Sequence, residues 1–270
     1  MKSMNRFLQL VDRLGAWAAS MGKTAFDVIA LFYDTVTAIF VGGKKGIAAS
    51  LKQTVNQILF TGVEAFWLVG IIGLLCGITI IIQAMTTMPK FGVGEYFGNI
   101  LVMVVVRELG PFFTSLVVVG RSGSALAAYI GNMRVAKELS ALEMMGIDPV
   151  HFIVMPAFFA MVVSMVCLSV YFDVIAIIGG YFIAQVKVSI PFGFFMGTVL
   201  DSLRPNDIII SIFKNVLFGS IVALMSCYHG LAVTNMREVP QAALKSVVSC
   251  MIITLLINIL VTFFTFFLSL

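Results

Sequence analysis

Charged residues are scarce in this chain. Asp, Glu, Lys and Arg supply only 11% of its 270 residues, whereas soluble domains carry about 25%. Hydrophobic residues supply 60%, in runs long enough for membrane-spanning helices of about 20 residues. The runs are continuous rather than alternating, which favours helices over a transmembrane barrel. We therefore expect an all-α integral membrane protein, with membrane lipids around it and no nucleic acid as a partner.

Residues for metal, redox or nucleotide chemistry are also few. Neither His151 nor His229 has a second metal ligand nearby, and the four cysteines occur singly in apolar runs. No GxxxxGK[ST] motif is present, so we expect no nucleotide site in this chain. These absences predict a protein that binds no metal and no cofactor of its own.

The first 56 residues have apolar side chains at helical spacing with basic residues beside them. One set is Phe7, Leu10, Val11, Leu14, Trp17 and Met21, and a second is Phe26, Ile29, Tyr33, Val36 and Phe40. Helices of this kind lie in the membrane interface. We expect residues 1–56 to form interfacial helices. Charges at Arg6, Asp12 and Arg13 argue against a cleavable signal peptide.

The remaining residues, 57–270, are expected to form the transmembrane domain. The apolar runs predict five spans, near residues 61–84, 97–119, 151–183, 208–232 and 246–269. The third run is too long for one upright helix. A break at Gly179-Gly180 would split it, giving six spans and moving the C-terminus to the other side.

The distribution of basic residues predicts the orientation of the spans. With the N-terminus inside, twelve Lys and Arg residues lie in cytoplasmic segments and three in outside segments. This bias follows the positive-inside rule. We therefore expect the connection between the second and third spans to be cytoplasmic and the C-terminus to lie outside.

That connection, Arg121–Pro149, is polar and has a helical pattern of its own. Gly146 and the Asp148-Pro149 turn are placed to end the helix. A helix of about eleven residues is marginal alone and needs a docking surface. We expect residues Val135–Met145 to dock a partner, although a helix resting on the membrane or on its own bundle has the same spacing. The residues expected at the docking surface are Val135, Lys137, Glu138, Leu139, Leu142, Glu143 and Met145.

Arg107 and Glu108 lie within an apolar run, where each charge costs at least about 2.5–3.5 kcal/mol. Such charges normally face the bundle and are paired. Adjacent helical residues point about 100° apart, so these two do not satisfy each other fully. The candidate partners are Asp173 and Lys214, with Glu64 a weaker one. The charges either line a cavity for the headgroup of an amphiphilic substrate or form a purely structural network.

Three motifs occur in order in these segments: RELGP at 107–111, GRSGSALAAYIGNMR at 120–134 and ELSALEMMGIDP at 138–149. They closely resemble the signature of MlaE-type permeases, the YrbE-like membrane subunits of ABC transporters that work with MCE proteins. The resemblance extends over nearly the whole chain. The motif residues are Leu109, Gly110, Pro111, Gly120, Arg121, Gly123, Ser124, Gly131, Asp148 and Pro149.

The resemblance implies a non-catalytic permease subunit of a bacterial inner membrane. Such permeases form dimers, here a homodimer or a heterodimer with a second permease. Each binds one subunit of a cytoplasmic ABC ATPase dimer, which carries the ATP and Mg²⁺, through the helix after the second span. A periplasmic MCE protein ring sits on the outer side, and phospholipids or related lipids occupy the cavity between the permeases. Arg107, Glu108 and Lys214 match charged residues that the family keeps inside the membrane.

The chain departs from the family pattern at three positions. The family usually has an acidic residue at Tyr129, often Glu-Gln at Lys137-Glu138, and often Asp at Asn258. The change at Lys137 reverses a charge on the expected docking helix. The departures are compatible with pairing to a second, different permease.

Two other functions fit parts of the sequence. A secondary transporter or channel would use Arg107, Glu108, Asp173 and Lys214 as an ion or proton relay. It predicts inverted repeats with paired broken helices, and the sequence has no convincing internal repeat. A membrane-bound lipid enzyme needs a convergent set of catalytic residues near the interface, and neither histidine has such neighbours.

Overall fold

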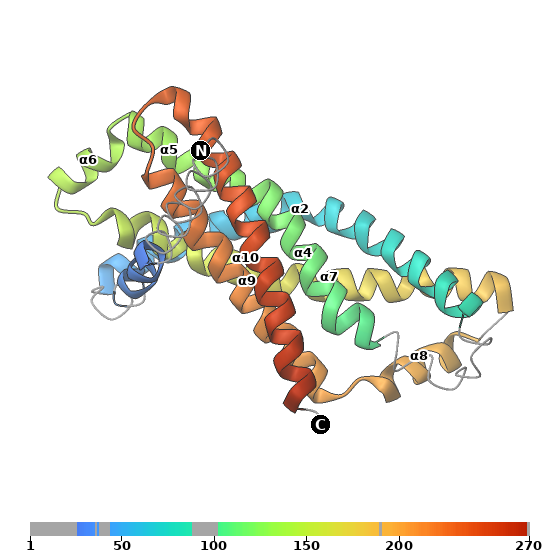
Figure 1. The fold of residues 1–270 in the computed structure, drawn as a ribbon. Helices are drawn as coiled ribbons and strands as arrows, with labels where there is room; N and C mark the ends of the chain where they lie inside the picture. Colours follow the sequence, from blue (N-terminus) through green and yellow to red (C-terminus); the bar gives the residue numbers. More distant parts are fainter. Residues whose placement is uncertain (1–25, 36, 38–43, 88–101, 189–190, 269–270) are drawn as a thin grey trace, which may run out of the picture.

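A computed structural model describes residues 26–35, 37, 44–87, 102–188 and 191–268 (Figure 1). These residues form helices and short connections, without a strand among them. Five of the helices are long and apolar enough to cross a membrane. The predicted all-α membrane fold is therefore confirmed.

Helical segments follow one another along the described part of the chain. In chain order they are α2 (Lys44–Thr87), η3 (Met103–Leu109), α4 (Gly110–Val118), η4 (Val119–Gly123), α5 (Ser124–Val135), α6 (Glu138–Met144), η5 (Val150–Val154), α7 (Met155–Val188), α8 (Phe192–Ser202), α9 (Pro205–Leu231), η6 (Met236–Glu238) and α10 (Val239–Leu268). Here η3, η4 and η5 are π-helical turns that continue directly into their neighbours, and η6 is a 3₁₀ turn.

The five candidate spans cover Thr54–Thr86, Met103–Val135, Val150–Val186, Pro205–Leu231 and Met236–Thr265. The second differs from its prediction, because the helix does not stop at residue 119. It continues through Gly120 and Gly123 to Val135. The wide turn of η4 accommodates these small residues without ending the helix, and Ser124 Oγ donates to the Gly120 carbonyl at 2.6 Å. Half of the expected polar connection is therefore part of the second span's helix.

The third span is a single helix, so the alternative with six spans is wrong. α7 continues through Gly179 and Gly180 without a break. Both glycines face α2: a Cβ on Gly179 would lie 3.2 Å from the Leu74 carbonyl oxygen, and one on Gly180 would overlap the Ile81 side chain. The glycines therefore allow close packing rather than a bend.

The contact between α2 and α7, here called the α2–α7 seam, relies on small residues from both helices. A Cβ on Gly77 would overlap the backbone carbonyl of Ala176, and a Cβ on Gly73 would meet the Phe172 carbonyl at 3.1 Å. Small residues let the backbones of membrane helices approach closely. The seam therefore depends on backbone contact, with no ion pair between the two helices among their described residues.

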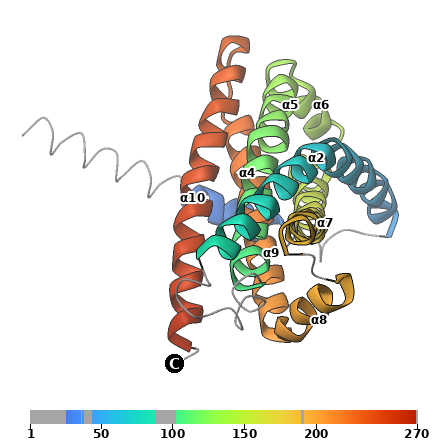
Figure 2. The same ribbon diagram turned by 90° about the vertical axis from the view of Figure 1, so that its right-hand side faces the viewer.

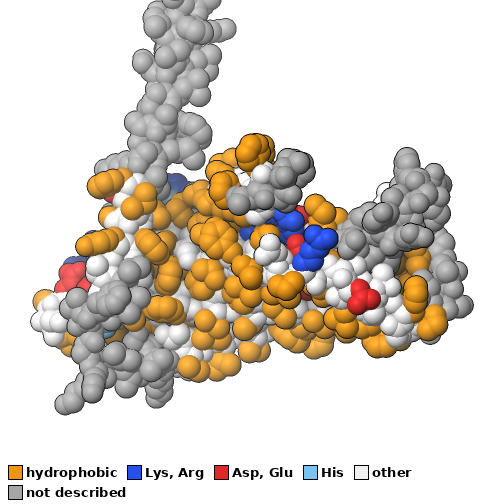
Figure 3. All heavy atoms as spheres, turned by 90° about the horizontal axis from the view of Figure 1, so that it is seen from below, with side chains coloured by type: hydrophobic (Ala, Val, Ile, Leu, Met, Phe, Trp, Pro, Cys, Tyr) orange, Lys and Arg blue, Asp and Glu red, His pale blue; other side chains and the backbone are white. Residues whose placement is uncertain are grey.

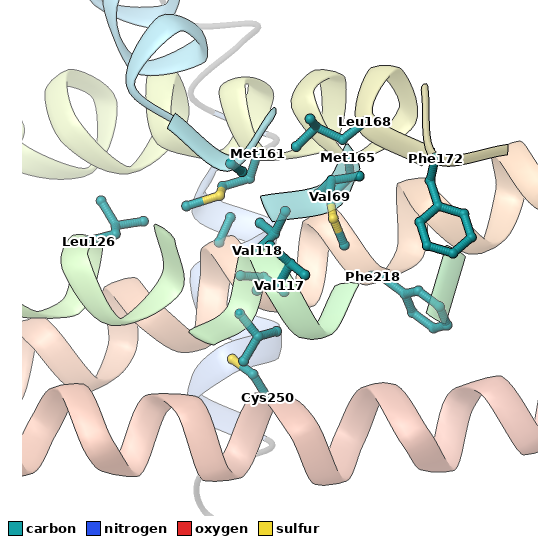
Figure 4. Close-up of a cluster of buried hydrophobic side chains, with 14 of the residues drawn as sticks. Val69, Val117, Val118, Leu126, Met161, Met165, Leu168, Phe172, Phe218 and Cys250 are labelled. Atoms are coloured by element: carbon teal, nitrogen blue, oxygen red, sulfur yellow. The ribbon is translucent and has the colours of Figure 1, made fainter. Parts of the chain in front are cut away.

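Apolar side chains from four spans meet in the centre of the bundle. Val69 of α2, Val118 of α4 and Phe218 of α9 are buried there, with Met165 and Phe172 of α7 (Figure 4). α10 adds Cys250 from its side of the bundle.

Two short helices mark opposite ends of the bundle. α6 lies at one end and α8 at the other, as both views show (Figures 1 and 2). α8 was not predicted, because residues 184–207 read as a connection between spans. Its Phe195 and Val199 are buried, and the Phe195 ring centroid lies 5.5 Å from that of Tyr181. We call these ends of the molecule the α6 end and the α8 end.

Much of the predicted interfacial segment lies outside the described residues, namely 1–25, 36 and 38–43. Residues 26–35 are helical, and Phe26, Ile29 and Tyr33 are exposed on this helix. Asp27 accepts a hydrogen bond from Tyr228 at 3.3 Å, and Phe32 contacts Phe158 of α7. Residues 44–56, expected in the same segment, are continuous with the first span in α2.

Candidate functional site

A cluster of charged and hydroxyl side chains joins η3, α9 and α10. Lys214 of α9 is wholly buried, and its ammonium donates to three oxygens. These are Glu108 Oε2 at 2.7 Å, Thr262 Oγ1 at 3.0 Å and the Arg107 carbonyl at 3.3 Å. An ammonium has three donors, so Lys214 is fully used. Thr262 in turn donates to Glu108 Oε2 at 2.8 Å. The expected contact between Glu108 and Lys214 is present.

The Arg107 guanidinium is held less tightly. Its Nη2 donates to Thr265 Oγ1 at 2.7 Å. Its distances to Glu108 Oε1 and to Asp207 Oδ1 are both 3.8 Å, beyond hydrogen-bond length. Nε is buried without a hydrogen-bond partner. Arg107 therefore has unused donor capacity, and its side chain is 14% exposed. We call these six residues the Lys214 cluster: Arg107, Glu108, Asp207, Lys214, Thr262 and Thr265.

Local helix geometry explains why Lys214 reaches the backbone. Pro111 has no N–H to donate to the carbonyl of Arg107, four residues earlier. Lys214 donates to that carbonyl instead. The segment that carries Arg107 and Glu108 is the π-turn η3, and such turns are frequent at functional sites.

The Lys214 cluster lies toward the α8 end and not at mid-span as expected. Asp207 is in the first turn of α9, and Thr265 is near the end of α10. Arg107 and Glu108 are nearer the start of the second span than predicted, because this span extends to Val135, well beyond its predicted end. Seen from below Figure 1, basic and acidic side chains gather on a largely hydrophobic face (Figure 3).

Two candidate partners of Arg107 and Glu108 are not in the cluster. Asp173 of α7 lies against Gly110 and takes part in no ion pair among the described residues. Glu64 of α2 pairs with Arg121. Their contact points on the second span, Gly110 and Arg121, come two and thirteen residues after Glu108 and therefore lie on another face of that helix.

The expected docking helix is shorter than predicted. Val135 ends the preceding helix α5 and packs against the small cluster of Val233, Val239 and Ala242. Lys137 lies in the left-handed region with φ 62°, which separates α5 from α6. α6 therefore spans Glu138–Met144, and the continuous helix expected from Val135 to Met145 is not formed.

The burial of α6 also differs from the expectation. Leu139 is 1% exposed and Leu142 is partly buried, both against the core of the same chain. The exposed apolar side chains are Met144 and Met145, at 83% and 66%. Glu138 and Glu143 are exposed beside them. The surface of α6 that is free in this chain therefore consists of methionines and glutamates, without Leu139.

The end of α6 follows the sequence pattern. Gly146 has φ +75°, and Ile147 N–H donates to the Leu142 carbonyl at 3.0 Å, which completes a Schellman-type cap. Asp148 Oδ1 then accepts from Val150 N–H at 3.0 Å and caps the next helix, in which Pro149 occupies the first turn.

Other motif residues of the second span mediate close packing. A Cβ on Gly123 would lie 3.2 Å from Ser226 and Val222 of α9, and one on Gly131 would lie 3.2 Å from Val233. Gly120 is exposed and has nothing within 4 Å of such a Cβ. Gly123 and Gly131 thus pack inside the chain, whereas Gly120 does not.

The positions that depart from the family pattern lie in different surroundings. Tyr129 is half-exposed and lines a cavity of about 320 Å³ with Asn56, Gln57 and Phe60. Asn258 Oδ1 is buried without a hydrogen-bond partner. Lys137 forms the turn described above.

Three members of the Lys214 cluster were not anticipated from the sequence. Asp207 fell in the expected outside segment, although its place in the first turn of a helix after Pro205 was a usable signal. Thr262 and Thr265 lie three residues apart in the last span, so they share a face. No group of three potential metal ligands among His, Cys, Asp and Glu occurs in the searched residues.

Comparison with known proteins places the chain in a family. Residues 54–264 match the family described as Permease MlaE. The chain is 31% identical over 222 residues to the intermembrane phospholipid transport system permease protein MlaE of Haemophilus influenzae, covering 82% of this chain and 85% of that protein.

Two further relatives are named probable ABC transporter permease proteins. One, from Rickettsia prowazekii, is 30% identical over 213 residues, which are 78% of this chain and 82% of that protein. The other, from Synechocystis, is 28% identical over 241 residues, with 87% and 92% covered. The matched region contains all five candidate spans almost completely. The chain belongs to the MlaE permease family.

Proposed function

We propose that this chain is the permease subunit of an ABC transporter that moves phospholipid or a related lipid between the inner membrane and a periplasmic MCE protein. Family membership supports the class of transporter. The observation that supports a lipid as the substrate is the unused hydrogen-bond donor capacity of Arg107 in the Lys214 cluster. ATP hydrolysis takes place on a separate ATPase subunit, so this chain itself is not catalytic.

The charges of the Lys214 cluster define how a headgroup binds. Two cations and two carboxylates balance one another, so an arriving phosphodiester must displace a carboxylate to bind favourably. Asp207 is the weakest neighbour, at 3.8 Å from Arg107 and at the start of α9. Arg107 is the residue that binds the phosphate, because guanidinium geometry matches phosphate oxygens. Lys214 stays bound to Glu108 and holds the site in shape.

The test of this role is lipid transfer by the full complex with its ATPase and MCE partners, reconstituted in liposomes. Arg107→Gln removes the charge and should reduce phospholipid transfer at least about tenfold, the loss of roughly one charge-assisted hydrogen bond. Arg204→Gln removes an exposed arginine at the same end of the bundle and is the control. Unchanged transfer by Arg107→Gln, with normal assembly, would refute headgroup binding there.

The ATPase subunit is proposed to bind α6. Met144 and Met145 are its most exposed apolar side chains, and flexible methionines suit a docking surface. Met144→Asp should therefore release the ATPase during co-purification while the permease remains in the membrane. Met236→Asp changes another exposed methionine, in the connection between α9 and α10, and should retain it. Release by both variants equally would assign docking to a different surface.

A second permease copy is proposed to complete the lipid cavity. α10 is the span least covered by its own chain, with 17% of its apolar window buried against 33–56% for the others. In a homodimer both copies have the same orientation, with the N-terminus in the cytoplasm and the C-terminus in the periplasm. Mass measurement of the purified native complex tests this arrangement, and two different permease chains in one complex would contradict the homodimer.

A further inference from the structure

Three buried polar side chains without hydrogen-bond partners lie where α4 packs against α7. Thr114, Ser169 and Asp173 are 0%, 1% and 8% exposed. Thr114 Oγ1, Ser169 Oγ and Asp173 Oδ1 each lack a partner. None of these atoms belongs to the Lys214 cluster. Buried polar groups are normally satisfied, so three unsatisfied groups on two contacting helices require an explanation.

Helix geometry places the three side chains on one contact surface. Asp173 lies against Gly110, and the neighbouring rings of Phe113 and Phe172 stack at 6.1 Å. Thr114 is four residues after Gly110, and Ser169 is four residues before Asp173. Consecutive spans run in opposite directions, so these steps of one turn lead the same way along the contact. Thr114 therefore lies on α4 at the level of Ser169 on α7.

Gly110 leaves room for the carboxyl group. A Cβ at this position would overlap Asp173 Oδ1 and would lie 3.3 Å from Oδ2. The side chain therefore rests directly on the backbone of α4. Nearby residues of α7 are apolar: Phe172 precedes Asp173 in the chain, and it is buried in the core with Leu168 (Figure 4).

No basic side chain neutralises this carboxyl among the described residues. Arg107 and Lys214 are bound within the Lys214 cluster, and Arg121 pairs with Glu64. α4 carries no titratable residue. The titratable side chains on the other elements packed near this part of α7 are Glu64 and Cys76 on α2, Arg107 and Glu108 on η3, and Asp207 and Lys214 on α9.

An unpaired carboxylate within a span is expensive, so Asp173 needs a cation or a proton. Divalent cations take about six or more oxygen ligands, and three side-chain oxygens are far fewer. Helix hydrogen bonds occupy the neighbouring backbone carbonyls. A proton needs only the carboxyl group itself, and neither Thr114 nor Ser169 makes a hydrogen bond to Asp173 in this structure. We propose that Asp173 binds one proton within the membrane while α4 and α7 are packed together.

This site makes the contact between α4 and α7 sensitive to pH. When the helices separate, water reaches the carboxyl group, which releases its proton and becomes solvated. The packed form holds one proton more than the separated form. Raising the pH therefore weakens the packed form relative to the separated one, by up to about tenfold in the equilibrium per pH unit. The inference does not depend on the proposed lipid substrate or on Arg107.

Infrared difference spectroscopy tests the bound proton directly. The full-length protein in its complex is placed in lipid nanodiscs, and Asp173→Asn is compared with the unchanged chain. The expected result is a band of a protonated carboxylic acid at neutral pH that the variant lacks. Gly110→Ala should shift this band, because the added Cβ would overlap Asp173 Oδ1 and displace the carboxyl group. A carboxylate band at neutral pH overturns the proposal, as does a protonated band that disappears when Na⁺ replaces choline.

Thermal unfolding of the same samples tests the pH dependence. Between about pH 6 and about pH 9 the unchanged protein should lose stability, and Asp173→Asn should lose distinctly less. Asp201→Asn, which changes an exposed aspartate of α8, should behave as the unchanged protein. The same pH dependence in the chain with and without Asp173 contradicts the site. If Asp173→Asn does not fold, the band shift in Gly110→Ala decides.

Discussion

The α2–α7 seam and the Lys214 cluster hold helices together by different means. The seam brings two long helices so close that a Cβ on Gly77 would meet a backbone carbonyl. The cluster joins η3, α9 and α10 through ion pairs and hydroxyl groups. The seam has no spare capacity for a ligand, whereas the cluster has an incompletely satisfied guanidinium.

This difference separates the parts of the molecule that move from those that do not. Backbone packing is short-ranged, so the seam is either intact or lost, and α2 and α7 behave as one body. The hydrogen bond from Arg107 to Thr265 exchanges with one to a ligand or water at small cost when the new partner is equally polar. We expect α10 to shift against η3 during transport, while Lys214 stays bound to Glu108 and the seam stays closed.

The largest expected effect comes from removing the central cation. Lys214→Met leaves Glu108 without its partner in a buried site and should cost about 3–5 kcal/mol in unfolding free energy. Lys245→Met, which changes an exposed lysine of α10, is the control. Adding Glu108→Gln to Lys214→Met should recover part of the loss, because the unpaired charge is gone. No recovery in the double variant, measured by denaturant unfolding, would contradict the ion pair.

A methyl group in the α2–α7 seam should have the next largest effect. Gly77→Ala places a Cβ against the Ala176 carbonyl, which cannot rotate away, and should cost about 3 kcal/mol. Gly193→Ala puts the same methyl group where nothing lies within 4 Å and should change stability by less than about 0.5 kcal/mol. Similar melting temperatures for the two variants would show that the seam is not closely packed.

A smaller loss is expected when a hydroxyl group leaves the Lys214 cluster. Thr262→Val removes one acceptor of Lys214 and one donor to Glu108, while their ion pair stays, and should cost about 1.5 kcal/mol. Thr262→Ser keeps the hydroxyl and should retain most of the stability. Equal losses in the two variants would assign the effect to packing of the methyl group.

The smallest expected effect is that of Asp207. Its carboxylate is 3.8 Å from Arg107 and partly exposed, so Asp207→Asn should change stability by less than about 1 kcal/mol. Because it leaves Arg107 more available, the variant should bind anionic phospholipid more tightly in the full complex. Titration with lipid nanodiscs of rising anionic content measures this. Weaker binding would mean that Asp207 itself contacts the lipid.

The five spans were predictable because long apolar runs dominate every other signal. Their ends were not, since polar residues such as Arg121 and Arg134 mark where a helix leaves the membrane and not where it stops. The polar connection therefore turned out to be largely helix. The short α6 was recognisable from Gly146 and Asp148-Pro149, but its start was not, because nothing in the sequence marks Lys137 for the left-handed region.

The polar residues were predictable to the extent that charge is conspicuous in an apolar run. Arg107, Glu108 and Lys214 stood out for this reason. Their threonine partners did not, because threonine is ordinary in a membrane helix and commonly bonds its own backbone. Asp173 stood out but received the wrong partner, since only the rotation of α7 in the bundle decides which side chains it meets.

The turn at Lys137 has a mechanical consequence. It joins α6 to a helix that continues without interruption from Val102 to Val135 and carries Arg107 near its far end. At about 1.5 Å per residue this helix is a strut of roughly 50 Å. A torque that a bound protein applies to α6 therefore rotates the whole helix from Val102 to Val135 and, with it, Arg107. The wide turns at η3 and η4 are where that helix is most compliant, so they set how much of the torque is transmitted.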